Sequence, residues 1–334
     1  MATWYEGLEP LLRNPEIDVV YVATPNHCHL EDCLACIRAG KGVLCEKPFA
    51  LNLAQAQIVV EAARQHNVFC MEGMWTRFIP AVREAKRRMV AGEIGPVRFL
   101  QGNFAYPVSR ENAGRLFDVE VGGGALLDRG VYLLSLAQHL LGTPTSIHGS
   151  TVLGPTGVDE QSSYHLVYAG GTIADLTASL WVRGTNEFSI YGERGWLRLC
   201  DPFYGAHRLE TRAFACPQTS QASSRQKQQG LRGMGRSLRR NPFVQLLRRR
   251  LGSLLGLLER NRFQSFPFAG NGYQFELMEV TRCLQNKRTE SDIMPLNETL
   301  EVMRLMDTLR SQWGLVYPQE DPELQREQDD ILVC

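Results

Sequence analysis

The sequence lacks net charge, because 36 Lys and Arg balance 36 Asp and Glu over 334 residues. A neutral chain has no general attraction to nucleic acid or to acidic lipid, so we expect no nucleic-acid partner. The amino-terminal residues 1–6 show neither the basic nor the apolar region of a secretory signal, and no apolar run approaches the length of a membrane span. The expected compartment is therefore the cytoplasm.

Cysteine is present but shows no pairing pattern. The nine cysteines are scattered and odd in number, which is typical of reduced thiols in a cytosolic protein. Cys33-x-x-Cys36 has no second pair or ligand cluster beside it, and we expect it within a helix. The sequence therefore predicts no metal site.

The first seventy residues alternate between helical and strand patterns, which indicates a parallel sheet. The run Asp18–Ala23 has the continuous β-branched character that a strand buried on both faces requires. Asn52 is a suitable N-cap for the second long helix. The predicted elements are helix 4–13, strand 18–23, helix 29–39, strand 42–46, helix 52–65 and strand 68–72.

From about residue 96 the pattern changes to alternating strands joined by tight turns, which is typical of an antiparallel sheet. We predict strands at 97–106, 146–153, 162–169, 172–183, 186–191 and 196–200, with one helix from about 130 to 141 and another carrying an apolar stripe from 296 to 309. The expected fold class is an incomplete Rossmann-type parallel sheet, residues 1–74, followed by an open antiparallel sheet domain with helices on one face, residues 75–334.

Residues 217–268 interrupt this pattern and are interpreted as an insertion. Between 225 and 262 there are eleven Lys or Arg and one acid, Glu259. An amphipathic helical pattern begins near Pro242. The segment is either a solvated loop with one docked helix, or an interfacial helix that makes weak contact with anionic membrane or an acidic partner.

Two short motifs follow neighbouring predicted strands. Glu46-Lys47-Pro48 follows strand 42–46, and Thr24-Pro25-Asn26 follows strand 18–23. The carboxyl ends of parallel strands meet at the edge where α/β sheets bind cofactors. A lysine there can assist the proton transfer that accompanies hydride transfer, although a surface lysine is the simpler interpretation from composition alone.

A second constellation begins with Gly122-Gly123-Gly124 and continues to Asp128 and Tyr132. The glycines would let the backbone approach a ligand closely. Asp128 and Tyr132 are four residues apart and would share one face of a helix. A nearby ammonium would lower the phenol pKa and make Tyr132 an acid or base, whereas alone it is more simply a packed aromatic.

Together with Thr24-Pro25-Asn26-His27-x-His29 and the segment Met71–Phe78, these motifs resemble the glucose-fructose oxidoreductase/inositol dehydrogenase (GFO/IDH/MocA) family. The segments Trp75–Phe78 and Arg115–Asp118, and the tyrosine at 132, look most like its dihydrodiol dehydrogenase branch. The resemblance implies an enzyme that uses NAD or NADP to transfer a hydride to or from the CH–OH group of a polyol, sugar or dihydrodiol. It also implies a homodimer formed through the outer face of the antiparallel sheet, which we expect to be apolar.

The resemblance implies roles at matching positions. Tyr132 would transfer the proton with help from Lys47, and Asp128 would hold the substrate or orient Tyr132. Glu46 and Lys47 would face the nicotinamide ribose and the substrate. The remaining cofactor positions are Thr24, Pro25, Asn26 and His29, and the substrate side would be formed by Trp75 and Arg77 together with Asp128.

No strand followed by Gly-x-Gly-x-x-Gly, the usual pyrophosphate-binding loop, occurs in the chain. Only three of the six strands of a complete dinucleotide fold are counted, so the first strand and its loop would lie upstream of Met1. Three explanations remain: a truncated record of a normal enzyme, a shortened homologue with lost cofactor affinity, or a non-catalytic binding homologue. The unpaired edge at 18–23 favours truncation, because such an edge promotes aggregation.

Overall fold

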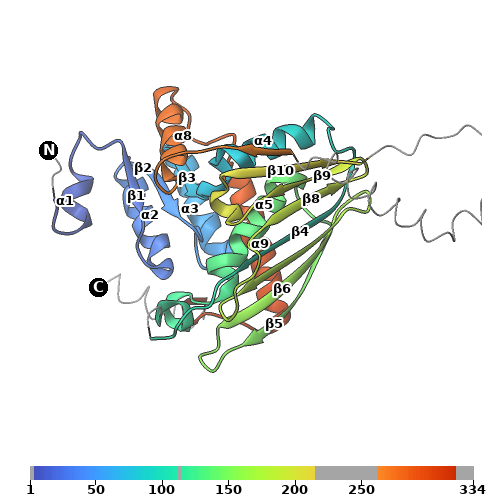
Figure 1. Ribbon diagram of the computed structural model, residues 1–334. Helices are drawn as coiled ribbons and strands as arrows, with labels where there is room; N and C mark the ends of the chain where they lie inside the picture. Colours follow the sequence, from blue (N-terminus) through green and yellow to red (C-terminus); the bar gives the residue numbers. More distant parts are fainter. Residues whose placement is uncertain (1–3, 112–113, 215–261, 321–334) are drawn as a thin grey trace, which may run out of the picture.

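A computed structural model describes residues 4–111, 114–214 and 262–320 of the protein (Figure 1). The predictions for the basic insertion, including the helix near Pro242 and the charged run up to residue 261, lie outside these described residues. None of the helices within the described ranges is both long and apolar enough to cross a lipid bilayer.

The amino-terminal part forms a parallel sheet of three strands in the order β1-β2-β3, as predicted. The strands β1 (Val19–Val22), β2 (Gly42–Glu46) and β3 (Cys70–Gly73) alternate with helices α2 (His29–Arg38) and α3 (Leu53–His66), and a short α1 (Leu8–Leu12) precedes them. β2 lies in the middle and its residues 42–45 are buried. β1 lies at the edge, with Tyr21 44% exposed, so the prediction of a strand buried on both faces is wrong. No strand among the described residues covers its outer side.

The start of α3 is fixed by the cap that the sequence predicts. The side chain of Asn52 accepts a hydrogen bond from the backbone N–H of Gln55 at 2.8 Å, and its amide donates to Glu320 Oε1 at 2.9 Å. The cap satisfies one of the free N–H groups of the first turn and ties the helix to the carboxyl-terminal segment.

The second sheet has eight strands in the order β11-β10-β9-β8-β4-β7-β6-β5. All neighbouring strands are antiparallel except β4 and β7, which run parallel. The sheet is therefore mixed, whereas the sequence predicted an antiparallel sheet. The long connection from β4 through a helix and the β5–β7 meander returns the chain beside β4 in the same direction. The strands are β4 (Val97–Ala105), β5 (Ser146–Leu153), β6 (Asp159–Val167), β7 (Ile173–Ser179), β8 (Phe188–Gly192), β9 (Gly195–Leu199), β10 (Arg208–Ala213) and β11 (Arg262–Ser265).

The outer face of this sheet is mixed in character, so the expectation of an apolar face holds only in part. His148, His165 and Asp175 are cross-strand neighbours on it, and Ser163 and Thr177 stand in the next row. The alternate residues of the same strands, such as Leu166 and Leu176, are buried on the inner face. The inner side, which faces the helices, is largely apolar. On the outer side an apolar row crosses five strands, formed by Val167, Ile173, Phe99, Tyr191 and Trp196.

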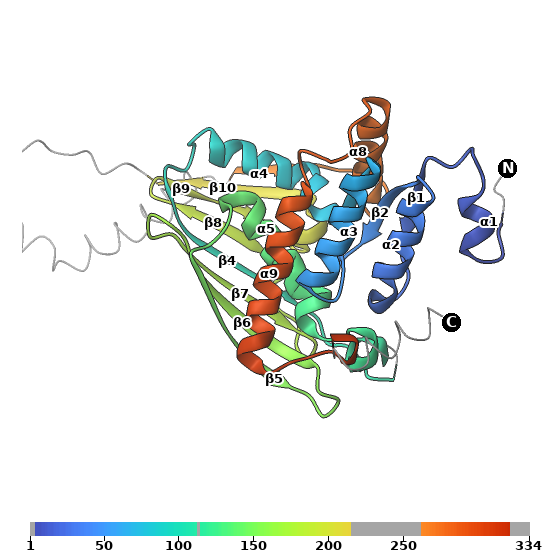
Figure 2. The ribbon, with the colours of Figure 1, turned by 180° about the vertical axis from the view of Figure 1, so that it is seen from behind.

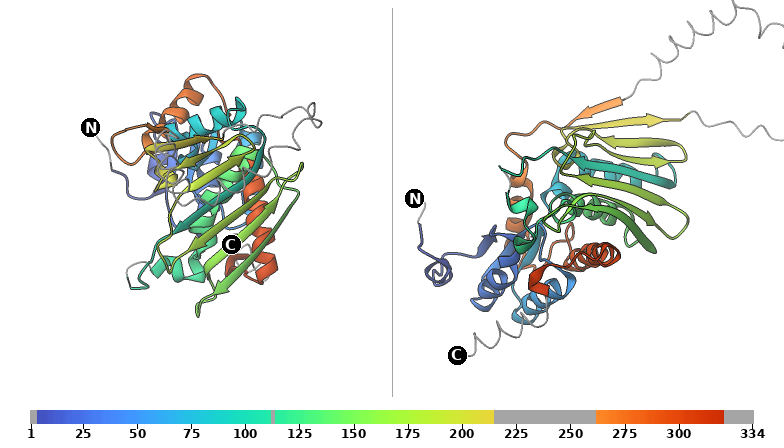
Figure 3. Two further views of the ribbon diagram at one scale, coloured as in Figure 1. Left: turned by 45° about the vertical axis from the view of Figure 1, so that its right-hand side comes forward. Right: turned by 90° about the horizontal axis from the view of Figure 1, so that it is seen from below.

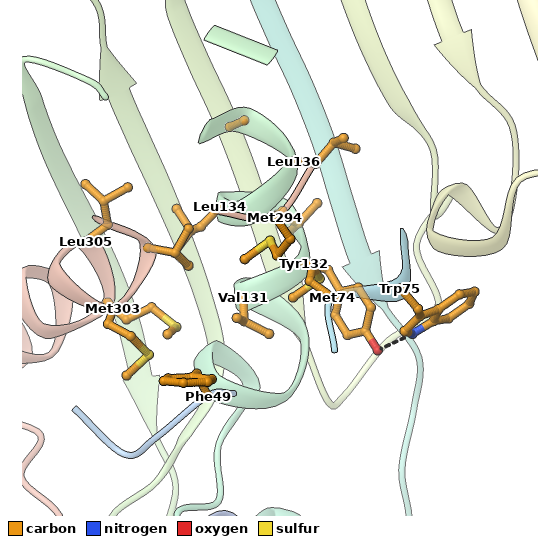
Figure 4. Packing of buried hydrophobic residues seen from close by; sticks show 14 of the residues in the cluster. Phe49, Met74, Trp75, Val131, Tyr132, Leu134, Leu136, Met294, Met303 and Leu305 are labelled. Carbon is orange, nitrogen blue, oxygen red and sulfur yellow. Dashed lines mark hydrogen bonds between the residues drawn. The ribbon is translucent and has the colours of Figure 1, made fainter. Parts of the chain in front are cut away.

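Four helices cover the inner face and the space between the two sheets: α4 (Pro80–Val90), α5 (Val131–Leu141), α8 (Tyr273–Gln285) and α9 (Leu296–Trp313). Figure 2 shows α5 and α9 lying against the large sheet, with α3 beside α9, and Figure 3 shows this helical layer from the side and from below. The sequence predicted α5 and α9 but not α4 or α8. The core is continuous from one sheet to the other, because Phe49 of the small-sheet half packs near Val131 and Met303 (Figure 4).

We expect Asn52→Ala to lower the free energy of unfolding by about 1–2 kcal/mol, because it removes the N-cap of α3 and the bond to Glu320. Urea denaturation measures the loss. Gln57→Ala, on the exposed face of the same helix, is the matched control and should change stability by less than about 0.5 kcal/mol. Equal losses in the two variants would show that the cap does not contribute.

Candidate active site

A cavity of about 450 Å³ lies at the carboxyl ends of β1 and β2, where the sequence places the two strand-end motifs. It is bounded on the opposite side by the start of α5 and by α8. Residues from both halves of the chain thus form one site. Its lining residues are Ala23, Thr24, Pro25, Asn26, His29, Glu46, Lys47, Arg115, Tyr132 and Tyr273.

Lys47 connects the two halves at this cavity. Its ammonium donates hydrogen bonds to the backbone oxygen of Asp128 at 2.9 Å and to Asp128 Oδ1 at 3.0 Å. The two side chains are only 13% and 17% exposed, so the charges are largely shielded from solvent. The same ammonium lies 5.0 Å from the ring centroid of Tyr132. Lysine and tyrosine therefore converge, as the sequence interpretation requires.

Asp128 belongs to a single π-helical turn, Leu126–Gly130, that leads into α5. No local sequence pattern predicts this turn. Such π-turns occur frequently at functional sites. Asp159 holds it from the large sheet by accepting the N–H of Leu126 at 2.8 Å. Burial raises the pKa of Asp128, but the charges of Lys47, Arg115 and Arg129 lower it by a larger amount. The pKa therefore lies below its usual value, and the carboxylate stays ionised.

The glycine triplet before this turn serves the packing of the protein and not a ligand. A Cβ at Gly124, where φ is +118°, would collide with Asp159 Oδ1, and one at Gly122 would collide with Leu51. At Gly123 a Cβ would lie within 2.9 Å of three backbone oxygens. The expectation that these glycines admit a ligand is therefore wrong. They let the turn that carries Asp128 lie against the rest of the fold.

Tyr132 is buried, and its hydroxyl accepts a hydrogen bond from Trp75 Nε1 at 3.0 Å (Figure 4). Burial raises the pKa of Tyr132 well above the usual value for a phenol, although the bond from Trp75 opposes this. The expectation that Lys47 would lower this pKa is therefore wrong. The ammonium lies 5.0 Å from the ring centroid and donates both of its hydrogen bonds to Asp128, none to the phenol oxygen.

The residues predicted to bind cofactor all line the cavity, but most of their polar atoms already have protein partners. Thr24 Oγ1 donates to Asp32, and Asn26 Nδ2 donates to the backbone oxygen of Gly122 across the two halves at 3.0 Å. The ring nitrogens of His29 lie 2.9 Å from the backbone oxygens of Pro48 and Thr24. His29 thereby joins the two strand-end motifs, and burial lowers its pKa despite these contacts.

Arg77 does not line the cavity, so the prediction of a substrate contact is not supported by its position. Its side chain is completely buried and forms an ion pair with Glu298. It also donates to the hydroxyl and the backbone oxygen of Ser135 on α5 at 2.8 and 2.9 Å. A buried guanidinium needs such partners, and here it fixes α5 relative to α9. Trp75 is not a cavity-lining residue either, but it contacts Tyr132 and Tyr273 edge-on.

Sequence reasoning missed four residues at or beside the cavity: Tyr21, Arg115, Tyr273 and Glu276. Tyr21 donates its hydroxyl hydrogen to Glu46, and Arg115 approaches Asp128 Oδ1 at 3.6 Å. Glu276 is 1% exposed, and its Oε2 has no partner among the described residues. Burial, and then the charge of Glu46, raise the pKa of Glu276 to about 8. Glu276 reaches the side of the cavity because it lies on α8, a helix that the sequence analysis did not predict.

The chain is similar to one family over both of its halves. Residues 2–74 match the family model described as oxidoreductase family, NAD-binding Rossmann fold, and residues 82–198 match the GFO/IDH/MocA C-terminal domain. The trans-1,2-dihydrobenzene-1,2-diol dehydrogenase of Danio rerio is 31% identical over 323 residues, which cover 95% of this chain and 83% of that protein.

Solved structures share the fold. The aldose-aldose oxidoreductase of Caulobacter crescentus, complexed with glycerol, superposes with a TM-score of 0.68 at 22% identity, covering 90% of this chain and 78% of that one. KijD10, a 3-ketoreductase from Actinomadura kijaniata in complex with NADP and TDP-benzene, superposes with a TM-score of 0.70 at 21% identity, covering 92% and 82%.

The buried acid Glu276 predicts a pH dependence of stability. Its pKa is near 4.5 when unfolded and about 8 when folded, so between these values the unfolded state releases a proton that the folded state keeps. The free energy of unfolding therefore falls as pH rises from about 5 to 8. In Glu276→Gln this fall should be smaller by roughly 2–4 kcal/mol, at about 1.4 kcal/mol per pKa unit.

Urea denaturation at pH 5, 6.5 and 8 measures this difference. Glu72 and Asp159, whose pKa values burial raises to about 7, contribute a fall of the same sign that the variant retains. Glu61→Gln, on the exposed face of α3, is the control and should keep the slope of the unmodified protein. An unchanged slope in Glu276→Gln would contradict the assignment.

Proposed function

Because the chain belongs to the GFO/IDH/MocA oxidoreductase family, we propose that it is an NAD(P)-dependent dehydrogenase or reductase acting on a CH–OH group of a dihydrodiol-like or sugar-like substrate. The observation that carries this proposal is the convergence of Lys47, Asp128 and Tyr132 on one cavity at the carboxyl ends of the parallel strands.

The cavity fits the reactive end of a nicotinamide dinucleotide. Its volume of about 450 Å³ is in the range of small-molecule sites, and the unpaired Oε2 of the buried Glu276 lies in the cluster of Tyr21, Glu46 and Tyr273 beside it. The bound dinucleotide would supply the acceptor or donor of the hydride. Residues Thr24–Asn26, Glu46 and Lys47 would hold its nicotinamide end. The described residues contain no glycine-rich loop after a strand that would bind the pyrophosphate.

Tyr132 is the proposed proton-transfer residue. Trp75 donates to the phenol oxygen, which leaves the phenol O–H free to point toward a substrate oxygen. Because burial raises the pKa of Tyr132, the phenol is protonated at neutral pH and is ready to donate during carbonyl reduction. Trp75 acts through Tyr132 as a positioning residue, since its hydrogen bond also stabilises the phenolate.

Lys47 and Asp128 would fix the geometry and charge around the transferred proton. The Lys47 ammonium has a third N–H beyond the two that Asp128 accepts, and we propose that this group binds the reacting oxygen. Arg115, 63% exposed at the cavity edge, is placed to contact the far end of a substrate.

Aromatic side chains pack around Tyr132 behind the cavity wall. Phe104 packs edge-on against Tyr132 with ring centroids 5.3 Å apart, and Tyr204 stacks on Phe104 at 4.5 Å. Trp75 and Tyr273 add two further rings. The two rings of this cluster that line the cavity, Tyr132 and Tyr273, favour a cyclic diol like the one in the name of the Danio rerio relative over an open-chain polyol.

Other parts of the proposal rest on the sequence alone. The homodimer, the cytoplasmic location, the division into domains at residues 74 and 75, and a weak anionic-membrane contact through 225–262 stay predictions. The mixed outer face of the large sheet implies that a dimer formed there would be held by hydrogen bonds as much as by apolar contact.

The decisive experiment combines titration with NADH and NADPH with kinetics on trans-1,2-dihydrobenzene-1,2-diol. We expect Tyr132→Phe to lower kcat by about 10²-fold or more, while the dinucleotide Kd changes little. The rate of alcohol oxidation should rise with pH in the unmodified enzyme, since Tyr132 must lose its proton, and this slope should vanish in Tyr132→Phe. Tyr168→Phe, which removes a buried hydroxyl without a partner among the described residues, is the matched control.

Two results would contradict the proposal. Full activity in Tyr132→Phe would reject the proton-transfer role. Failure of the protein to bind either dinucleotide would favour the alternative that it is a non-catalytic binding homologue, which the exposed edge of β1 also allows.

A further inference from the structure

A second cavity, of about 310 Å³, lies between α4 and the carboxyl-terminal end of α5. His139 in its wall is seven residues beyond Tyr132 on α5, which is about 10 Å along the helix axis. The two cavities share no lining residue. The walls of this second cavity are formed by Arg83, Lys86, Arg87, Val90, His139, Asp292 and Ile293.

Positive charge exceeds negative charge around this cavity. The nearby acids are already paired with other cations: Glu298 with Arg77, Glu84 with Arg87 and Arg88, and Asp292 with Arg288. Within residues 4–111, 114–214 and 262–320, Arg83 and Lys86 have no carboxylate within ion-pair distance. Both line the cavity, so two cations that form no ion pair face the same space, with Glu298 acting on Lys86 only at longer range.

Lys86 is held in place by a neutral partner. Its ammonium lies 3.2 Å from His139 Nδ1. Burial, and then the charges of Arg77, Lys86 and Arg83, lower the pKa of His139 to about 2, so the ring is neutral and accepts the hydrogen bond. Lys86 therefore keeps its charge and two further N–H donors beside Arg83. Burial also lowers the pKa of Lys86, and the charge of Glu298 opposes this only in part.

The geometry is suited to a doubly charged oxyanion. Arg83 and Lys86 are three residues apart on α4, so their side chains lie on one face of the helix. A guanidinium offers paired donors and an ammonium a compact charge, which together match phosphate oxygens. Val90, which is 75% exposed, and Ile293 extend the wall beyond the cations and give it an apolar part. Asp292 at the rim would repel a second anionic group.

We propose that this cavity binds a small organic phosphate, with the phosphate on Arg83 and Lys86 and the organic part on Val90 and Ile293. The ligand carries one phosphate group. This site is separate from the proposed active site and does not depend on the proposed activity.

Isothermal titration with phenyl phosphate, at constant ionic strength set by sodium chloride and without dinucleotide or substrate, tests the proposal. We expect saturable binding to the unmodified protein and a loss of affinity of at least about tenfold in Arg83→Gln/Lys86→Gln, since each charge-assisted hydrogen bond contributes that much. Arg13→Gln/Arg304→Gln removes the same charge from α1 and α9 and should bind like the unmodified protein. Asp292→Asn should bind more tightly, because it removes the carboxylate at the rim.

Inorganic phosphate is the second probe, and it should bind more weakly than phenyl phosphate because it leaves the apolar wall unused. Equal affinity for the two would overturn the organic part of the proposal. Wild-type affinity in the Arg83/Lys86 variant, with an unchanged circular dichroism spectrum, would overturn the site itself, as would an absence of binding to the unmodified protein. Thermal unfolding in the presence of phenyl phosphate gives an independent reading: the melting temperature should rise in the unmodified protein and in the Arg13/Arg304 control but not in the Arg83/Lys86 variant.

Discussion

The bond between Lys47 and Asp128 is the interaction on which the rest of the site depends. Lys47 stands at the end of β2 in the small sheet, and Asp128 stands on the π-turn before α5, 81 residues away. Two hydrogen bonds and opposite charges join them where solvent is largely excluded. Such a pair stabilises only when its remaining bonding groups are satisfied. Here Arg115 and Arg129 supply further positive charge to Asp128.

The pair Lys47–Asp128 is held in place by contacts that lie outside the cavity. Asp159 holds the π-turn from the large sheet, and the glycines at 122–124 allow the close approach that this requires. On the other side, Asn26 reaches across to the Gly122 carbonyl. The geometry at the cavity therefore depends on both sheets, and the small sheet cannot form the site by itself. Tyr132, buried and bonded to Trp75, is fixed by the same framework.

Sequence reasoning found the parts of this framework that leave local signals. The apolar run of β2, the cap at Asn52 and the motif Glu46-Lys47-Pro48 are each visible within a few residues, and their places in the fold are as predicted. Sequence reasoning failed where a residue's pKa or position depends on residues that are distant in the sequence. The raised pKa of Tyr132 comes from burial by other elements, and the position of Arg77 is set by Glu298 on α9.

Two more features depend on distant neighbours in the same way: the parallel pairing of β4 with β7, and the buried acid Glu276. Alternation within a strand predicts which side chains share a face, but it does not predict the direction of the neighbouring strand. Likewise, a glutamate in the first turn of a helix gives no local sign that the cluster of Tyr21, Glu46 and Tyr273 lies against it. These features become visible only when the two halves are assembled.

The coupling between Lys47 and Asp128 can be measured directly by a double-mutant cycle on the free energy of unfolding, with Lys47→Ala, Asp128→Ala and the double variant. Each single substitution leaves the partner charge shielded and without its two short hydrogen bonds, so the double variant should lose less stability than the sum of the single losses. We predict a coupling free energy of about 1–3 kcal/mol. Additive losses would contradict the account, because they would mean that the two halves of the site are held together by something else.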